Sequence, residues 1–542
     1  MLLRKAPVLN TILASLLAGA LVACGSGSSS STSSSQPVYT TVFDAGSSGT
    51  RLSFFKVTPG NGGYPQITKL YEKEYDDNGI NDFLNGVGTI TLVKKGVNIL
   101  PDGKRPVNCT GGTVVITADE TIIEGLGQTD VSPCVIEPLL LAQDATLASN
   151  KLSRAQVKTE LFATAGMRTE EKFNGGTFTA SQISEYYGRM KTYVASMGFG
   201  TGEFKTINGN KEEGVWTWIN LNDQYYNAFG GNTAYCGTNC TPTTVGDFEV
   251  GGSSMQIAFP TKTLPVGDTN NVYSVTINGY TYNVFSKTFL GLGGDDARKY
   301  MRSYGYNTRV TTYNTGLECF ASNATSSSTR EDSGVTLFYN FLFFPNSTTI
   351  STNAVDNTWS PTLSNTQTPL LLGNNPSYSY NGCAVKYADV SDAIIALPRN
   401  NYGTIPNQIT PASYSNFASK VAQSSSPFVG LDNFFYTAKD LGLAVDTQVT
   451  NNFTSQQFYQ ALAGSSSKCV TGSVSATSIK GGSAVCANGT FMNDFLWRAN
   501  GGLFVQGTTS AFKGVVPTRL NGVTTLTWTR GYLLQKYANA AN

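Results

Sequence analysis

The sequence predicts an α/β protein built as two lobes, and three observations lead to this fold class. Two glycine- and serine-rich loops that carry an acidic residue recur in the chain, DAGSSGTR from Asp44 to Arg51 and EVGGSSMQ from Glu249 to Gln256. Each loop stands between two short runs of β-branched or aromatic residues, which is typical of a strand, a tight turn and a returning strand. Segments compatible with helix alternate with these strands, and the repeated turn indicates two related halves.

The first half of the chain holds the first loop and its neighbouring segments. Tyr39 to Phe43 is predicted as a buried strand, and Arg51 to Val57 as the strand that returns after the loop. A short strand is expected at Glu160 to Ala163, and Ser181 to Met197 has the spacing and composition of a helix. In Lys211 to Asn222 an acidic pair precedes an alternating apolar run, a pattern that fits a strand.

The second half repeats this order of elements. Gly246 to Val250 is the predicted strand before the glycine pair, and Met255 to Phe259 is the strand after it. Further segments have helix-compatible composition: Asp295 to Tyr304, Phe434 to Leu443, Asn493 to Arg498 and Trp528 to Tyr537. Two Ser/Thr/Asn-rich stretches, Ala321 to Ser333 and Asn346 to Asn375, are interpreted as surface loops or an inserted subdomain.

The N-terminal residues have the pattern of an export signal. Arg4 and Lys5 precede an apolar run from Val8 to Val22, which is too short for a stop-transfer helix. The run leads into LVAC, so residues 1–23 resemble a bacterial lipoprotein signal peptide, with Cys24 as the lipidated residue and the Ser-rich residues 24–36 as a flexible tether. An ordinary signal peptide with an incidental cysteine is the alternative. We therefore expect a lipid-anchored bacterial envelope protein that faces the periplasm or the cell surface.

Composition narrows the classes of function. The chain has 542 residues, a formal net charge of +1 and no histidine. Because nothing in it is basic enough to follow a nucleic-acid backbone, no nucleic-acid partner is expected. The lack of histidine excludes Ser-His-Asp and Cys-His nucleophile systems, histidine general bases and histidine-ligated zinc. Acid–base chemistry therefore falls to carboxylates, Lys, Tyr or Cys.

The cysteines favour disulfides. Of the nine in the chain, all but Cys24 remain once that residue is assigned to lipidation, and an even number in an exported chain is typical of paired cysteines. Neighbours in sequence suggest four pairs, although spacing alone leaves the connectivity open: Cys109 with Cys134, Cys236 with Cys240, Cys319 with Cys383, and Cys469 with Cys486.

The two acidic loops have the composition of an anion-binding site shared between lobes. Glycine leaves the backbone N–H groups accessible, and serine and threonine add hydroxyl donors, so a polyphosphate fits between two such turns.

Around these loops the chain resembles the nucleoside triphosphate diphosphohydrolases, or apyrases, of the actin, Hsp70 and sugar-kinase superfamily. Signature regions occur in the family's order: DAGSSGTR at Asp44, ATAGMR at Ala163, EEGVWTWINLN at Glu212 and EVGGSSMQI at Glu249. Supporting matches are FSKTFLGLGGDDA at 285–297, ECF at 318–320, FVGLDNFFYTA at 428–438 and WTRGYLL at 528–534. The resemblance covers roughly residues 38–540.

The resemblance implies a two-lobed actin-like (ribonuclease H-like) fold with the active site in the cleft between the lobes. Lobe I is expected at 37–222 with a C-terminal return at 515–542, and lobe II at 223–514. The activity it implies is metal-dependent hydrolysis of the terminal phosphates of nucleoside tri- and diphosphates, without a covalent intermediate. These nucleotides are the expected partners, together with the membrane through the lipid anchor, and we expect a monomer.

Phosphoryl transfer is catalysed mainly by placing donors around the phosphate oxygens and aiming a water in line. For Arg51 and Arg168 the alternative is a structural role. The residues expected to contact phosphate are Gly46, Ser47, Ser48, Gly49, Thr50, Arg51, Thr164, Ala165, Gly166, Arg168, Gly251, Gly252 and Ser253.

The attacking water needs a base, and the resemblance assigns this role to Glu213, the second glutamate of the EEG triplet. The alternative is a solvated residue at the start of a strand. Ser254 and Gln256 match the family residues that orient the water.

A divalent cation, Mg²⁺ or Ca²⁺, is expected near Asp44 and Glu249, held largely through water. The sequence departs from the family pattern here, because Glu249 stands where Asp is usual. Its extra methylene moves the carboxylate outward by roughly one ångström, which puts metal preference and rate in question.

The base of the nucleotide is expected to stack on aromatic side chains of the second lobe, among which Phe434, Phe435 and Tyr436 are the candidates. Core packing is the alternative for each of them. Trp216, Trp218 and Trp528 are interpreted as packing residues.

Two other functions remain open from the sequence. An exopolyphosphatase shares the pair of turns without the base-stacking lobe, and a lipid-tethered nucleotide-binding surface protein with weak or no catalysis shares the cleft and the serine-rich stalk.

Overall fold

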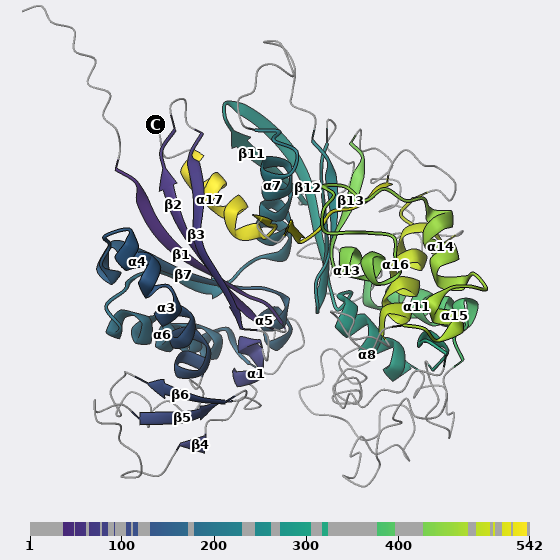
Figure 1. Cartoon of the computed structure of the whole chain (residues 1–542), viewed down its shortest axis with the longest axis horizontal. Coiled ribbons are helices and arrows are strands. Elements are labelled where there is room, and N and C mark those ends of the chain that lie inside the picture. The colour runs from purple at the N-terminus through teal and green to yellow at the C-terminus, as the bar shows by residue number, and fades with distance from the viewer. Residues whose placement is uncertain are drawn as a thin grey trace, which may run out of the picture. The chain divides into compact units, whose positions relative to one another are not determined.

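Two large β-sheets, two small ones and the helices beside them form the part of the chain that the computed structural model describes (Figure 1). The described residues are 36–47, 49–60, 64–75, 79–84, 91–92, 105–109, 112–116, 131–171, 178–229, 244–261, 271–304, 317–322, 377–395, 426–474, 484–498, 502–504, 512–521 and 524–538.

The first sheet has five strands in the order β3-β2-β1-β7-β8. β1 pairs with β2 antiparallel and with β7 parallel, and β7 pairs parallel with β8. Most side chains of β1 and β2 are buried, which explains their β-branched and aromatic composition. The strands are β1 (Val38–Ala45), β2 (Thr50–Thr58), β3 (Gln66–Tyr75), β7 (Val157–Ala163) and β8 (Gly200–Thr206).

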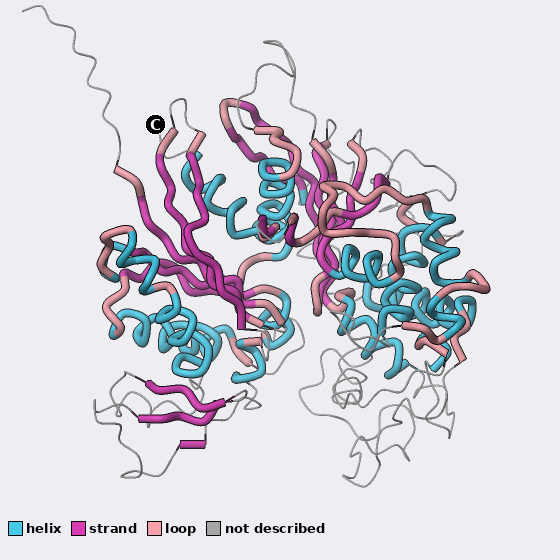
Figure 2. The backbone as a smooth tube through the Cα atoms, in the orientation of Figure 1, coloured by secondary structure: helices cyan, strands magenta, loops and turns pink. Residues whose placement is uncertain are grey.

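Helices accompany this sheet, drawn in cyan beside the magenta strands in Figure 2. The longest, α6, begins with a capping box in which Thr179 and Gln182 satisfy each other's backbone N–H groups. The helices are α1 (Ile80–Leu84), the π-helical turn Ser132–Ile136, α3 (Glu137–Ala142), α4 (Asp144–Ser149), the 3-10 turn Arg154–Gln156, α5 (Ala165–Glu170) and α6 (Ala180–Ser196). A separate small sheet holds β4 (Thr91–Leu92), β5 (Arg105–Cys109) and β6 (Gly112–Ile116).

The second sheet has six strands in the order β11-β12-β10-β9-β13-β14. β9 pairs antiparallel with β10 and parallel with β13, so the second acidic loop lies in the middle of the sheet. The strands are β9 (Gly246–Val250), β10 (Ser254–Pro260), β11 (Val272–Ile277), β12 (Tyr280–Leu290), β13 (Phe428–Asp432) and β14 (Phe512–Val515). The predicted strands on either side of both loops are thereby confirmed.

Helices and two disulfides complete this half. Cys319 bonds Cys383 and Cys469 bonds Cys486, as predicted. Cys134 is also disulfide-bonded, whereas the side chain of Cys109 and both Cys236 and Cys240 lie outside the described residues. The elements are α8 (Gly294–Tyr304), the 3-10 turn Leu317–Cys319, α11 (Tyr380–Ile395), α13 (Asn433–Asp440), α14 (Ser455–Ala463), α15 (Lys468–Thr471), α16 (Val485–Trp497), β15 (Arg519–Leu520) and β16 (Thr524–Thr525).

The segment predicted to fit a strand after the acidic pair is a helix. Gly209–Gly214 forms a π-helical turn that continues into α7 (Val215–Gln224). One apolar cluster joins α7 and the C-terminal helix α17 (Trp528–Ala538) to residues of both sheets. Trp216, Trp218 and Ile219 are all buried there, so α7 is apolar on several faces. A helix that is apolar on several faces can show the same alternating pattern as a strand, which explains the wrong prediction.

Several sequence predictions fall outside the described residues. These are the signal peptide at 1–23, Cys24, nearly all of the tether, and most of the two Ser/Thr/Asn-rich stretches. The lobe boundaries at 222, 223 and 514 stay predictions. Within the described part, none of the helices combines the length and the apolar character needed to cross a membrane.

Candidate active site

The two glycine turns meet. A Cβ atom built on Gly252 would lie 2.5 Å from Oγ of Ser47 and 3.2 Å from Oδ2 of Asp295. The first loop, at the end of β1, and the second loop, at the end of β9, therefore face each other at a distance that leaves no room for a side chain at position 252.

The second turn is held from behind by a helix N-terminus. The backbone N–H groups of Gly294 and Asp295 donate to the carbonyl oxygens of Gly251 and Gly252, at 2.8 and 3.0 Å. The side-chain amide of Asn433 donates to the Gly251 carbonyl at 2.9 Å. These bonds fix the predicted phosphate-binding residues Gly251 and Gly252 between β9 and α8.

The first turn is supported by the ATAGMR segment. Thr164 donates its backbone N–H to the carbonyl of Ala45 at 3.1 Å, and a Cβ atom on Gly166 would lie 2.7 Å from Cα of Ser47. Ala165, the residue before Gly166, is the first residue of α5. The structure thus brings the three predicted phosphate-binding segments together.

The predicted base is buried and pairs with an arginine of α5, which also bonds a serine of β10. Glu213 has 6% of its surface exposed, and its carboxylate pairs with Arg168 at 2.5 Å. The same guanidinium donates to Oγ of Ser254 at 3.2 Å, and Nε2 of Gln256 donates to that oxygen at 2.6 Å. Since Ser254 accepts from both neighbours, its own O–H is left to donate.

Arg168 has a role that the sequence did not predict. Its side chain, 2% exposed, donates to Glu213, to Ser254 and to the backbone carbonyl of Ile207. It therefore orients the predicted base in this structure. Direct contact of Arg168 with phosphate stays a prediction.

Glu213 repels both predicted metal-positioning acids, Asp44 and Glu249, and this repulsion contributes to their raised pKa values. Burial raises the pKa of Asp44 to about 7, which Arg51 opposes and Glu213 reinforces. Burial also raises the pKa of Glu249 well above its ordinary value, and Glu213 adds to this by repulsion. A cation among these acids would relieve both the burial cost and the repulsion.

This donor set fits a hard divalent cation bound through water. Carboxylate oxygens are the ligands that Mg²⁺ and Ca²⁺ prefer. Among the described side chains, however, no three acidic or cysteine groups lie close enough together to coordinate one ion directly. Asp44 and Glu249 would hold the ion through its water shell.

Each of these acids has a hydrogen-bond donor that the sequence reasoning missed. The indole N–H of Trp528 donates to Oδ1 of Asp44, and the hydroxyl of Thr217 donates to Oε2 of Glu249, both at 3.1 Å. The sequence assigns Trp528 to packing alone and gives no signal for Thr217. No local pattern joins residues so far apart in the chain.

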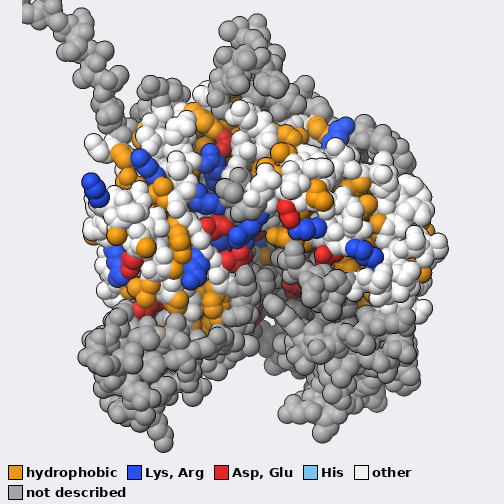
Figure 3. Space-filling model, in the orientation of Figure 1, with side chains coloured by type: hydrophobic (Ala, Val, Ile, Leu, Met, Phe, Trp, Pro, Cys, Tyr) orange, Lys and Arg blue, Asp and Glu red, His pale blue; other side chains and the backbone are white. Residues whose placement is uncertain are grey.

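Arg51 is held by an ion-pair network of the first sheet. It pairs with Glu74 at 2.5 Å, and Glu74 also pairs with Arg519 at 3.2 Å. Figure 3 shows positive and negative side chains interspersed on the face in view, most densely near its middle. Arg51, the second residue of β2, is thus paired with Glu74, and its guanidinium also lies 4.0 Å from a carboxylate oxygen of Asp44.

The remaining residues of the first loop differ in burial. Gly46, Ser47 and Gly49 are half-buried, whereas Thr50 is fully buried at the start of β2. In the second loop Ser253 is buried at 8% exposure. Ser48 lies outside the described residues.

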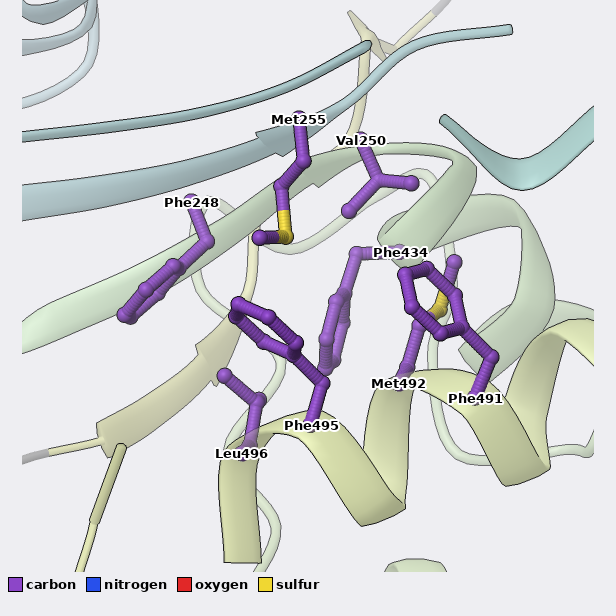
Figure 4. Close-up of a pocket in the computed structure, with 8 residues that line it drawn as sticks. All are labelled: Phe248, Val250, Met255, Phe434, Phe491, Met492, Phe495 and Leu496. Carbon is purple, nitrogen blue, oxygen red and sulfur yellow. The ribbon is translucent and has the colours of Figure 1, made fainter. Parts of the chain in front are cut away.

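Two of the three candidate stacking residues belong to the core. Phe434 points into an apolar pocket that it shares with β9, β10 and α16 (Figure 4). Phe435 is fully buried, and Tyr436 is half-buried against it. Neither phenylalanine presents a free face to a ligand in this arrangement, so the packing alternative describes both, and only Tyr436 retains an accessible surface.

Comparisons with known proteins find similarity to nucleoside phosphatases over part of the chain. Residues 130–386 match the model of the GDA1/CD39 (nucleoside phosphatase) family. Over 140 residues the chain is 29% identical to human ectonucleoside triphosphate diphosphohydrolase 3, an alignment that covers 26% of this chain and 25% of the relative. The match thus spans about a quarter of the length of that curated relative.

A solved structure supports the fold. The crystal structure of nucleoside triphosphate hydrolases from Neospora caninum is similar with a TM-score of 0.54 over 93% of each chain, at 16% identity. The predicted two-lobed, actin-like α/β fold is confirmed by this similarity. The PPX-GPPA enzyme of Aquifex aeolicus, with a TM-score of 0.37 and 9% identity over 92% of this chain and 99% of its own, is too distant to bear on function.

Proposed function

We propose that this protein hydrolyses the terminal phosphates of nucleoside tri- and diphosphates, because its residues 130–386 match the model of the GDA1/CD39 (nucleoside phosphatase) family. The observation that carries this proposal is the close approach of Ser47 and Gly252, which shows that the two glycine turns face each other. The buried carboxylate of Glu213 belongs to the same site. Such turns offer N–H and hydroxyl donors to phosphate oxygens, whose negative charge is spread in the transition state.

In the proposed reaction Glu213 accepts a proton from the attacking water. Arg168 holds the carboxylate of Glu213 in place, and Ser254 and Gln256 orient the water through the remaining hydroxyl proton and the amide. A divalent cation near Asp44 and Glu249, Mg²⁺ or Ca²⁺, would neutralise charge on the phosphates. The water attacks the terminal phosphorus as the phosphoanhydride bond to the next phosphate breaks. Inorganic phosphate and the nucleotide with one phosphate fewer are released, so no residue becomes phosphorylated.

The test replaces the base while keeping its shape. Glu213→Gln is expected to lower kcat by about two to four powers of ten, the usual contribution of a positioned general base. Glu212→Gln is the matched control, because the Glu212 carboxylate bonds Lys205 and the backbone N–H of Asn208 outside the cluster of acids. If Glu213→Gln retains most of the activity in a folded protein, the assignment of the base is wrong.

Substrate choice separates the proposal from its alternatives. Phosphate release is measured with ATP, ADP, GTP, UTP, AMP and inorganic polyphosphate, in Mg²⁺ or Ca²⁺. We expect hydrolysis of the nucleoside tri- and diphosphates and none of AMP. Preference for polyphosphate would support an exopolyphosphatase instead, and stabilisation by ATP with Mg²⁺ but no phosphate release would support a binding protein.

The N-terminal sequence supports a place for this activity. We propose that residues 1–23 are removed, that Cys24 is lipidated and that a monomer acts on nucleotides outside the cytoplasm. Labelling with a radioactive fatty acid that is lost in Cys24→Ala tests the anchor.

A further inference from the structure

Glu249 is held by a side chain from another element. Its Oε2 atom accepts a hydrogen bond of 3.1 Å from Oγ1 of Thr217, which lies on α7 and is 3% exposed. Within the described part of the chain, the hydroxyl of Thr217 is the hydrogen-bond donor to this carboxylate. A residue of the central helix therefore fixes an acid of the second sheet.

Thr217 lies one helical turn after Glu213. The two are four residues apart in the continuous helical run from Gly209 to Gln224, so their side chains share one face of the helix. The bond to Thr217 thus draws the carboxylate of Glu249 toward the face that carries the proposed base, although the two carboxylates repel each other.

The backbone of Glu249 is fixed, so only its side chain can change conformation. Glu249 is paired with Gln256 of β10 on one side and with Leu431 of β13 on the other, so its main chain is fixed in the middle of the sheet. The additional methylene of glutamate, compared with aspartate, adds one rotatable bond between this fixed backbone and the charge. A donor at the far end is needed to hold the longer side chain in one position.

We propose that Thr217 is a positioning residue, whose hydroxyl holds the carboxylate of Glu249 where it can bind the hydrated divalent cation. This inference rests on the proposed function, because it assumes a cation–nucleotide complex at the site. The longer acid at position 249 and the threonine on α7 then act as a pair, in which the hydroxyl fixes the carboxylate.

A double-mutant cycle tests the pair without turnover. Mn²⁺ is titrated into the full-length protein with saturating AMP-PNP, which is not hydrolysed, and free Mn²⁺ is measured by electron paramagnetic resonance. Thr217→Val removes the hydroxyl and is expected to weaken Mn²⁺ binding about tenfold, as the loss of a hydrogen bond to a charged group predicts. Thr217→Ser keeps a hydroxyl and should restore binding to within about twofold.

The background variant decides whether the effect passes through Glu249. An aspartate at this position is one methylene too short to reach Thr217, so Thr217→Val should change Mn²⁺ binding by less than about twofold when combined with Glu249→Asp. Thr192→Val, the same substitution on the exposed face of α6, is the control and should leave binding unchanged.

Each result has one meaning. Equal losses from Thr217→Val in the unaltered protein and in the Glu249→Asp background, or no loss in either, would overturn the pairing while leaving the proposed function intact. If the unaltered protein binds no Mn²⁺ with AMP-PNP, the proposed function itself is overturned. Urea unfolding without Mn²⁺ identifies a variant that has merely lost its fold, and Thr217→Ser then decides the question.

Discussion

Trp528 and Asp44 are joined by a hydrogen bond of 3.1 Å from the indole N–H to Oδ1, although 484 residues separate them in the chain. Trp528 begins α17, and its ring packs at 5.8 Å from that of Trp216 on α7. The helix that follows the proposed base therefore packs against the helix that holds an acid of the first sheet. Through this helix pair, Asp44 and Glu249 are both positioned relative to Glu213.

Trp528→Phe is expected to impair use of the divalent cation. The substitution keeps an aromatic ring but removes the donor to Asp44, and a hydrogen bond to a charged group is worth a factor of about ten or more. We expect the Mg²⁺ concentration for half-maximal activity to rise about tenfold. Measuring activity against Mg²⁺ concentration at saturating ATP gives this value.

Trp216→Phe is the matched control for this change. Trp216 belongs to the same helix pair, but its indole N–H donates to Gln535 and not to Asp44 or Glu249. We expect Trp216→Phe to lower stability without changing the Mg²⁺ requirement. A similar rise in both variants would mean that general packing of the helix pair, rather than the bond to Asp44, sets the requirement.

The local features of the fold were predictable from the sequence. The strands on either side of Asp44 and Glu249 follow from short β-branched runs interrupted by glycine, and this pattern is set by neighbouring residues. The cysteine pairs 319–383 and 469–486 were also predicted. The ordered signature segments then gave the site, because each segment carries its residues on a turn between regular elements.

Contacts between distant segments were not predictable in the same way. The apolar residues after Glu213 alternate with polar ones as in a strand, yet this segment forms the helix α7. Its side chains are buried in one apolar cluster with residues of both sheets. Arg168 has the charge expected of a phosphate ligand, but its partner Glu213 lies 45 residues away. Phe434 has the surface of a stacking residue, and only its place in an apolar pocket assigns it to the core. In each case tertiary packing decided among roles that the residue type allows.

Gly252→Ala is expected to separate the two turns. The φ angle of Gly252 lies outside the left-handed region, so alanine is compatible with the backbone, but its Cβ would lie 2.5 Å from Oγ of Ser47. One of the loops must move, and a displacement of about one ångström at a reacting site costs up to about a hundredfold in rate. Steady-state kinetics with ATP should show kcat/KM reduced by at least about tenfold.

Ser47→Ala provides the rescue. The added Cβ of residue 252 would be 3.8 Å from Cβ of Ser47, an ordinary contact, once the hydroxyl is gone. Gly252→Ala should therefore cost much less in a Ser47→Ala background than in the unaltered protein. Gly188→Ala on α6, where nothing lies within 4 Å of the new atom, should keep full activity. A cost of Gly252→Ala that is the same in both backgrounds would show that the turns do not meet as described.

The metal-free protein is expected to lose stability as the pH rises through the neutral range. Burial raises the pKa of Asp44 to about 7 from an ordinary value of 3.8, so between these two values the folded state holds a proton that the unfolded chain has released. Stability falls with increasing pH wherever the folded state binds more protons, and the raised pKa of Glu249 acts in the same direction. In EDTA the free energy of unfolding should be about 1–3 kcal/mol lower at pH 8 than at pH 5.5.

Asp44→Asn identifies how much of this slope belongs to the site. The amide does not titrate, so urea unfolding of Asp44→Asn in EDTA should show a shallower decrease between pH 5.5 and pH 8 than the unaltered protein shows. Mg²⁺ added at pH 8 should raise the free energy of unfolding of the unaltered protein, because it binds the ionised acids, and should raise that of Asp44→Asn less. An identical pH slope in the two proteins would mean that Asp44 is already ionised without a cation, and that its burial is compensated by Arg51 and Trp528 alone.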